Sequence, residues 1–204
     1  TKEMTMPRNQ PYVIILANGL NGLGAVRSAA HAGLKTYTLL TNHADLCTYS
    51  RFSQYRFLLP SNPSIDDLRP VLDQLHDNEG GPGVLLACSD MAAELLGQLK
   101  CEGYAKQHLV VPNAETTEVL NDKKLECRYM ENGGITLPKT YYQLSNDAPD
   151  VFPIIIKPRT FREYSVLGAK NVILNSMAEL DEFRERFNGH LDRFIGQEVI
   201  KGSD

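Results

Sequence analysis

The sequence predicts an α/β protein in two parts, a parallel-sheet domain over residues 1–112 and an α+β domain over residues 113–204. Up to about Pro112, short apolar runs alternate with helical periodicity, which is typical of repeated βα units. Beyond Pro112 strands dominate, and their arrangement is expected to be largely antiparallel. With 204 residues and 42% hydrophobic composition, the chain is long enough to bury a proper core.

In the first domain, each apolar run is expected to form a buried strand and each periodic stretch a helix. A helix should follow the first strand and stop at Gly33. A second helix is expected over residues 64–76, with Pro70 moving its start inward or kinking it. Ser89 or Asp90 should cap a third helix. The strands are expected at residues 12–17, 36–40, 56–59, 84–87 and 109–111.

In the second domain, one long helix is expected first, capped by Thr116 or Thr117 and ending at Gly133. A capping box formed by Ser176 and the glutamate three residues later should open another helix, which Gly189 closes. The strands are expected at residues 139–144, 152–157, 171–174 and 194–200.

Lys157 stands at the end of an otherwise apolar run, Phe-Pro-Ile-Ile-Ile-Lys-Pro at residues 152–158. Such a run predicts a strand buried on both faces, and Pro158 has no N–H with which to continue the ladder. Lys157 shares its face with Ile155, so an unpaired ammonium would be costly there. The lysine therefore needs an anion, either a surface carboxylate or a phosphate.

Composition excludes several classes of partner. The formal net charge is −4 with a pI near 5.7, and no block of lysine or arginine indicates binding to nucleic acid or to anionic lipid. No apolar stretch approaches the roughly 18 to 20 residues of a membrane span. The four cysteines lack metal-ligand spacing and are expected to be reduced thiols in the cytoplasm. We expect no nucleic-acid partner, no membrane partner and no metal site.

Glycines 19, 22 and 24 directly follow the first predicted strand and allow two interpretations. They could bring backbone amides close to the pyrophosphate of a dinucleotide at a helix N-terminus. However, the spacing is not G-x-G-x-x-G, and the residues after the second strand, 40–43, include no acid to hold a ribose. We favour a tight strand-to-helix turn, which can still line a small-molecule site.

Five segments occur in an order that resembles the nucleotide-binding part of ATP-grasp enzymes: residues 120–124, 134–140, 152–158, 176–180 and 196–202. The first half resembles the Rossmann-like domain that precedes the ATP-grasp domain in that superfamily. Residues 27–28, 50–52 and 89–90 look like a branch of carboxylate–amine ligases that includes D-aspartate ligase and relatives of carbamoyl phosphate synthase. The chain is therefore expected to be a pre-ATP-grasp domain followed by the first ATP lobe, with no segment resembling the second lobe.

The resemblance implies that Lys157 reaches the phosphates of ATP and that Lys123 assists it. Residues 197–201 correspond to the strand that contacts adenine. The loop at 159–170 has only one glycine where the family has several, so either its cations replace backbone amides or the loop is disordered without ligand. The residues expected to bind ATP are Lys123, Lys157, Arg159, Gln197, Glu198, Val199, Ile200 and Lys201.

The resemblance also implies an activity that this chain does not complete. The family transfers the γ-phosphate of ATP to a carboxylate, and the Mg2+ ligands belong to the second lobe, so we expect no catalytic residue within these 204. Carboxylate and amine substrates would be small molecules, and exposed apolar surface could favour a homodimer. An NAD(P)-binding oxidoreductase domain and a non-catalytic nucleotide-binding module remain alternatives. Possible substrate-side residues are Asn18, Gly19, Asn21, Gly22, Ser89 and Asp90.

Overall fold

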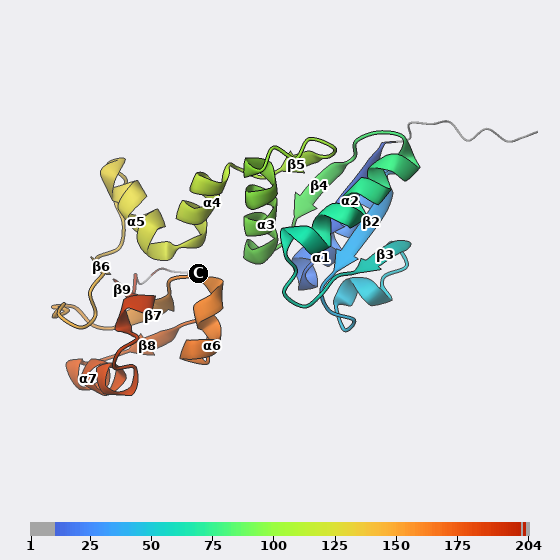
Figure 1. Cartoon of the computed structure of the whole chain (residues 1–204). Helices are drawn as coiled ribbons and strands as arrows, with labels where there is room; N and C mark the ends of the chain where they lie inside the picture. The colour runs from blue at the N-terminus through green and yellow to red at the C-terminus, as the bar shows by residue number, and fades with distance from the viewer. Residues whose placement is uncertain (1–10, 201, 203–204) are drawn as a thin grey trace, which may run out of the picture. The chain divides into compact units, whose positions relative to one another are not determined.

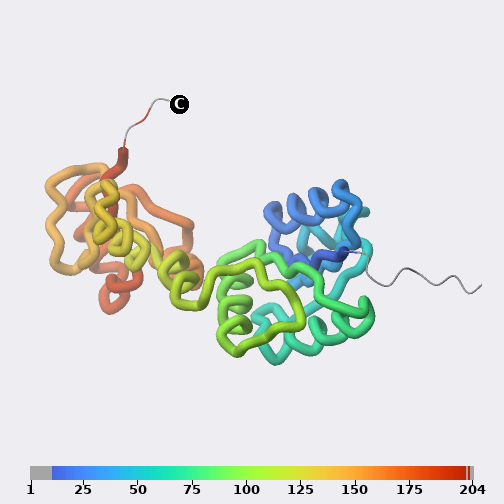
Figure 2. Tube along the Cα trace, turned by 90° about the horizontal axis from the view of Figure 1, so that it is seen from above, coloured from blue at the N-terminus to red at the C-terminus, as the bar shows by residue number. Residues whose placement is uncertain are grey.

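The computed structural model describes residues 11–200 and residue 202. The chain forms two compact units, one up to Thr117 and one from Glu118. Figure 2 follows the chain through the first unit in blue to green and through the second in yellow to red.

The first unit is a five-stranded sheet in the order β3-β2-β1-β4-β5, and every neighbouring pair is parallel. The strands are β1 Tyr12–Leu16, β2 Lys35–Leu40, β3 Tyr55–Leu58, β4 Val84–Ala87 and β5 His108–Val110. The helices are α1 Gly19–His31, α2 Ile65–Glu79 and α3 Asp90–Cys101, with a 3-10 turn η1 at Leu46–Tyr49 (Figure 1). The predicted parallel α/β fold is confirmed.

Strand β1 lies at the centre of this sheet and is buried along its whole length. Its Val13 and Ile15 face α1 and η1, where they pack with Val26 and Cys47. The alternate residues of β1 pack against α2 and α3 on the other face, as the period of two in a strand requires. The apolar run that predicted a fully buried strand therefore belongs to a sheet covered by helices on both faces.

Helix α2 begins at Ile65, so Pro70 does not move its start inward as expected. The Ser64 hydroxyl accepts from the backbone N–H of Asp67, whose carboxylate accepts in turn from the backbone N–H of Ser64. This reciprocal cap stabilises the first turn ahead of the proline. The helix ends at Glu79, and Gly80 caps it in a left-handed conformation with φ 73°.

The second unit contains an antiparallel sheet in the order β6-β9-β7-β8. Helix α7 packs against one face through Phe183, which forms an aromatic cluster with Phe194 and with Phe187, the residue that follows the helix. The antiparallel α+β arrangement is confirmed. The remaining elements are α4 Ala114–Asn121, α5 Lys123–Asn132, β6 Thr140–Tyr141, β7 Ile154–Pro158, η2 Phe161–Glu163, α6 Tyr164–Leu167, β8 Val172–Leu174, α7 Met177–Arg186, η3 Leu191–Arg193 and β9 Phe194–Glu198.

The single helix expected between Thr116 and Gly133 is in fact two helices, α4 and α5. Neither threonine is the cap, because Asn113 Oδ1 accepts from the Thr116 N–H at 2.8 Å. The break falls at Asp122, whose extended backbone and side-chain hydrogen bonds make it the N-cap of α5. Apolar residues stand on both sides of the break, Val119 and Leu120 before it and Leu125 and Met130 after it, which is why a single helix was expected.

Strand β7 is buried on one face only, contrary to the expectation of burial on both. Ile154, Ile156 and Pro158 are buried, whereas Ile155 and Lys157 are half-buried. The pairing also continues past the proline, since Pro158 lies opposite Phe194 and the Arg159 N–H donates to the Arg193 carbonyl at 2.9 Å. The predicted strand was displaced by two residues at its start and one at its end.

Other predicted boundaries in this unit were too wide. Strand β6 has two residues instead of six, β9 ends at Glu198 instead of residue 200, and α7 ends at Arg186, three residues before Gly189. No helix within the described ranges is both long and apolar enough to span a membrane.

Candidate functional site

Lys157 lies on β7, between β8 and β9, on the face of the sheet opposite the aromatic cluster. Its Nζ donates to Gln197 Oε1 on β9 at 2.7 Å. Across residues 11–200, Lys157 forms no ion pair with a carboxylate. Of the two anions that the sequence allowed, a surface carboxylate is thus not paired with Lys157 within the part of the chain that the structure describes.

Lys123 approaches the same region from the start of α5. Its backbone N–H donates to the carbonyl of Arg159 at 2.9 Å, which ties α5 to the residue two positions after Lys157. Burial raises the pKa of the Cys127 thiol, while the positive charges of Lys157 and Lys123 both act to lower it. The two lysines are far apart in the sequence, yet the charges of both act on the buried Cys127 thiol.

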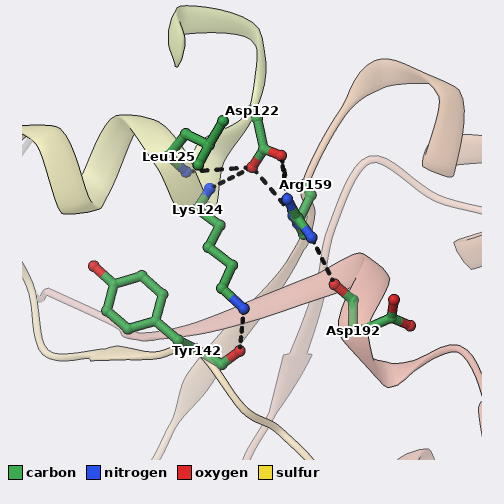
Figure 3. A network of polar contacts seen from close by, with 6 residues as sticks. All are labelled: Asp122, Lys124, Leu125, Tyr142, Arg159 and Asp192. Atoms are coloured by element: carbon green, nitrogen blue, oxygen red, sulfur yellow. Dashed lines mark hydrogen bonds and ion pairs between the residues drawn. The ribbon is translucent and has the colours of Figure 1, made fainter. Parts of the chain in front are cut away.

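Arg159 is held by Asp122 rather than left free for a ligand (Figure 3). Its Nε lies 3.1 Å from both carboxylate oxygens, Nη2 donates to Oδ2, and Nη1 donates to the Asp192 carbonyl at 3.3 Å. Asp122 accepts in addition from the backbone N–H groups of Lys124 and Leu125. In this conformation Arg159 fastens the start of α5 to the end of β7.

Asp122 is only 8% exposed, so the surroundings of its carboxyl decide whether it is ionised. Burial alone would raise its pKa, but the hydrogen bonds from Arg159 and from two helix amides outweigh burial and hold the pKa below its ordinary value. Asp122 is therefore a charged structural residue. Sequence reasoning placed it inside a helix and gave it no role of its own.

The segment after Lys157 folds into defined turns, η2 and α6, and its Leu167 is buried in the core of the second unit. Its glycine, Gly168, ends α6 with φ 74°. Both alternatives for this loop, cations that contact phosphate and disorder without ligand, remain predictions.

The end of β9 contains the residues expected near adenine. The Glu198 N–H donates to the Lys139 carbonyl at 2.9 Å, and its carboxylate accepts from the Lys139 N–H at 2.9 Å. Val199 is half-buried and Ile200 is 63% exposed, and both lie beyond the strand. Lys201 lies outside the described residues. The adenine-binding role of this segment remains a prediction.

The glycine turn of the first unit has a structural explanation. The Gly19 N–H, at the start of α1, donates to Asp45 Oδ2 at 2.7 Å, and the other oxygen of Asp45 accepts from the Cys47 N–H. A carboxylate thus occupies the helix N-terminus where a dinucleotide would place its phosphate. A Cβ on Gly22 would lie 2.8 Å from Ala17 Cβ, so close packing requires glycine there. These contacts favour the tight-turn interpretation.

Asp45 is a residue that sequence reasoning missed, because the search for an acid after the second strand stopped at residue 43. Ser89 likewise has a structural role, since its hydroxyl caps α3 by accepting from the Ala92 N–H at 3.2 Å. Nothing in the geometry of the first unit assigns a substrate to the predicted residues Asn18, Asn21 or Asp90. Within the described residues no group of three or more His, Cys, Asp and Glu side chains could hold a metal ion.

The chain matches no protein-family model and no curated protein. It is similar to solved structures, including an L-amino acid ligase from Bacillus licheniformis, with TM-score 0.65, 16% identity, and coverage of 97% of this chain and 46% of the other. A carboxyaminoimidazole ribonucleotide synthase from Aspergillus clavatus, complexed with ATP, gives TM-score 0.66 and 16% identity, and covers 95% and 48%.

A third similar structure is the biotin carboxylase domain of 2-oxoglutarate carboxylase from Hydrogenobacter thermophilus, in complex with MgADP, ADP and bicarbonate. It gives TM-score 0.59 and 14% identity, and covers 95% of this chain and 45% of the other. The chain thus spans about half the length of the structures that it matches. The chain shares its fold with these structures, which confirms the fold that the resemblance implied.

Proposed function

We propose that this chain is the ATP-binding part of an ATP-dependent carboxylate–amine ligase. The observation that carries the proposal is the Lys157 ammonium, which is half-buried on the sheet and has a neutral amide as its hydrogen-bond partner. A cation held in this way is suited to bind an anion, and the fold is shared with a protein whose structure contains ATP.

In the proposed complex, Lys157 and Lys123 contact the triphosphate and offset part of its charge. Glu198, Val199 and Ile200 lie at the adenine end, where a purine requires flat apolar contacts and a few placed hydrogen bonds. Arg159 contributes to this site mainly by keeping α5 in place through Asp122. Lys201 remains part of the proposal from the sequence alone.

The proposed reaction of the whole protein has two steps. A substrate carboxylate oxygen attacks the γ-phosphorus of ATP, the bond to the bridging oxygen breaks, and ADP leaves. An amine nitrogen then attacks the acyl carbon, phosphate leaves, and an amide forms with loss of a proton. Mg2+ would help to neutralise the phosphates in this reaction, and the described residues offer no ligand set for it. We assign this chain the binding of ATP and propose that it does not complete the reaction alone.

We further propose kinship with D-aspartate ligase and carbamoyl phosphate synthase, small-molecule carboxylate and amine substrates, a cytoplasmic location and a homodimer. The predicted substrate-side residues of the first unit belong to the same proposal. None of these details is required for the binding of ATP.

Titration of the 15N-labelled chain with ATP, and separately with NAD, tests the proposal by backbone amide shifts. ATP should shift the amide signals of residues on β7 and β9. Lys157→Met should weaken the binding of ATP at least about tenfold, because it removes one charge-assisted hydrogen bond. Lys106→Met is the control, since it removes a half-exposed lysine from the first unit. Binding of NAD but not ATP, or ATP affinity unchanged in Lys157→Met, would refute the proposal.

A further inference from the structure

Gln197 is 6% exposed, and both ends of its side-chain amide have partners. Its Oε1 accepts from Lys157 Nζ at 2.7 Å, and its Nε2 donates to Thr140 Oγ1 at 3.0 Å. The same nitrogen lies 3.5 Å from the Cys127 sulfur. Strands β6, β7 and β9 and helix α5 therefore meet at this one side chain.

The direction of each hydrogen bond follows from its neighbours. The Thr140 hydroxyl donates to the Pro138 carbonyl at 2.8 Å, so its oxygen can only accept from Gln197. The Lys157 ammonium has donors and no acceptor, so it can only face the amide oxygen. With both ends determined, the amide of Gln197 has a single orientation. A chain of donors runs from Lys157 through Gln197 and Thr140 to a backbone carbonyl.

The partner of Lys157 carries no charge, unlike the partners of Lys35 and Lys139; Lys100 and Lys124 likewise donate to neutral backbone carbonyls. Lys35 pairs with Glu79 at 2.7 Å and Lys139 pairs with Asp150 at 2.6 Å, so in both cases a carboxylate neutralises the ammonium. Gln197 fixes the place of the Lys157 ammonium but carries no charge. Since no carboxylate among the described residues pairs with Lys157, its positive charge is available there to an anion.

We propose that Gln197 is a positioning residue that orients Lys157 for the triphosphate of ATP without neutralising it. The inference rests on the proposed function and deepens it, because it gives Gln197 a role through Lys157 in place of a direct contact with the nucleotide. A buried amide costs free energy unless every hydrogen bond is made, so Thr140 is needed to hold the arrangement.

A double-mutant cycle with Gln197→Met and Lys157→Met, read as ATP affinity by amide shifts, tests the proposal. Gln197→Met keeps the length of the side chain and should lower the affinity for ATP about tenfold. The same change should have no further effect once Lys157 is Met, because the residue then has nothing to position. Gln197→Glu should lower the affinity for ATP more than Gln197→Met does, since a carboxylate would neutralise the Lys157 ammonium.

Adenosine, which has no phosphate, separates positioning from a structural role. The affinity for adenosine should be the same in the wild type and in Gln197→Met. If Gln197 were merely structural, the mutation would lower the affinities for ATP and for adenosine alike. If Gln197→Met does not fold, Thr140→Val removes the acceptor for Nε2 at nearly constant volume and should give the same pattern more weakly.

Two failures are distinguishable. Absence of ATP binding by the wild type would overturn the proposed function itself. ATP binding that is unchanged in Gln197→Met, or effects of the two mutations that add independently, would overturn the role of Gln197 alone.

Discussion

Replacing Asp122 by Asn should destabilise the second unit by about 2 kcal/mol. The change removes the charge that faces Arg159 but keeps a side-chain oxygen that can cap α5. Breaking a fully buried ion pair costs roughly 3 to 5 kcal/mol, because the remaining charge is left without a partner. The Arg159 side chain is 28% exposed, so water compensates part of that loss. The expected cost therefore falls to about 2 kcal/mol.

Asp122→Ala should cost about 1 kcal/mol more, because it also removes the cap of α5. Urea unfolding followed by circular dichroism measures both changes, with the slope against urea compared among variants. Asp181→Asn is the matched control, since its pair with Arg184 lies at the surface with the carboxylate side chain 59% exposed and should cost less than about 0.5 kcal/mol. A loss in Asp122→Asn no larger than in this control would refute the structural role of the pair.

Three further predictions concern pH, packing and thiol reactivity. Folding lowers the pKa of Asp122. Its contribution to the free energy of unfolding is therefore fully present above the ordinary carboxyl pKa of about 3.9 and is lost as pH falls through the folded value. In urea titrations, the stability difference between wild type and Asp122→Asn should be constant near pH 7 and shrink below about pH 4. Gly22→Ala should destabilise the first unit by about 1 to 3 kcal/mol in the same assay, because the new methyl would lie 2.8 Å from Ala17 Cβ, and an unchanged midpoint would contradict this. Burial raises the pKa of Cys47 to about 12, so a thiol reagent at pH 8 should modify the exposed Cys101 in the native chain and leave Cys47 unmodified until the chain unfolds.

The strands of the first unit could be predicted from the sequence to within one or two residues, because each is a short apolar run between turn residues. Helix α2 shows a limit of this reasoning: Pro70 suggested a later start, but the capping box at Ser64 determined it. The break at Asp122 could not be seen from periodicity, since Asp and Lys are common on the exposed face of a continuous helix.

Lys157 was identified from sequence as a cation that needs a partner, but the partner was not. The hydrogen bond to Gln197 depends on the register of β7 against β9, which places Ile155 opposite Gln197 and Lys157 opposite Ile195. That register is set by strands almost 40 residues apart and by side-chain packing between them. The contact of Arg159 with Asp122 could likewise not be predicted, because it depends on where α5 begins.

The contact between Lys157 and ATP can be followed at the Lys157 side chain itself. Lysine-selective isotope labelling makes the CεH2 group of Lys157 visible by NMR, and its signal is assigned by its absence from Lys157→Met. ATP should shift this signal with the same affinity as it shifts the amides of β9, and adenosine should not. ATP binding that leaves the Lys157 signal unmoved would show that Lys157 does not contact the phosphates.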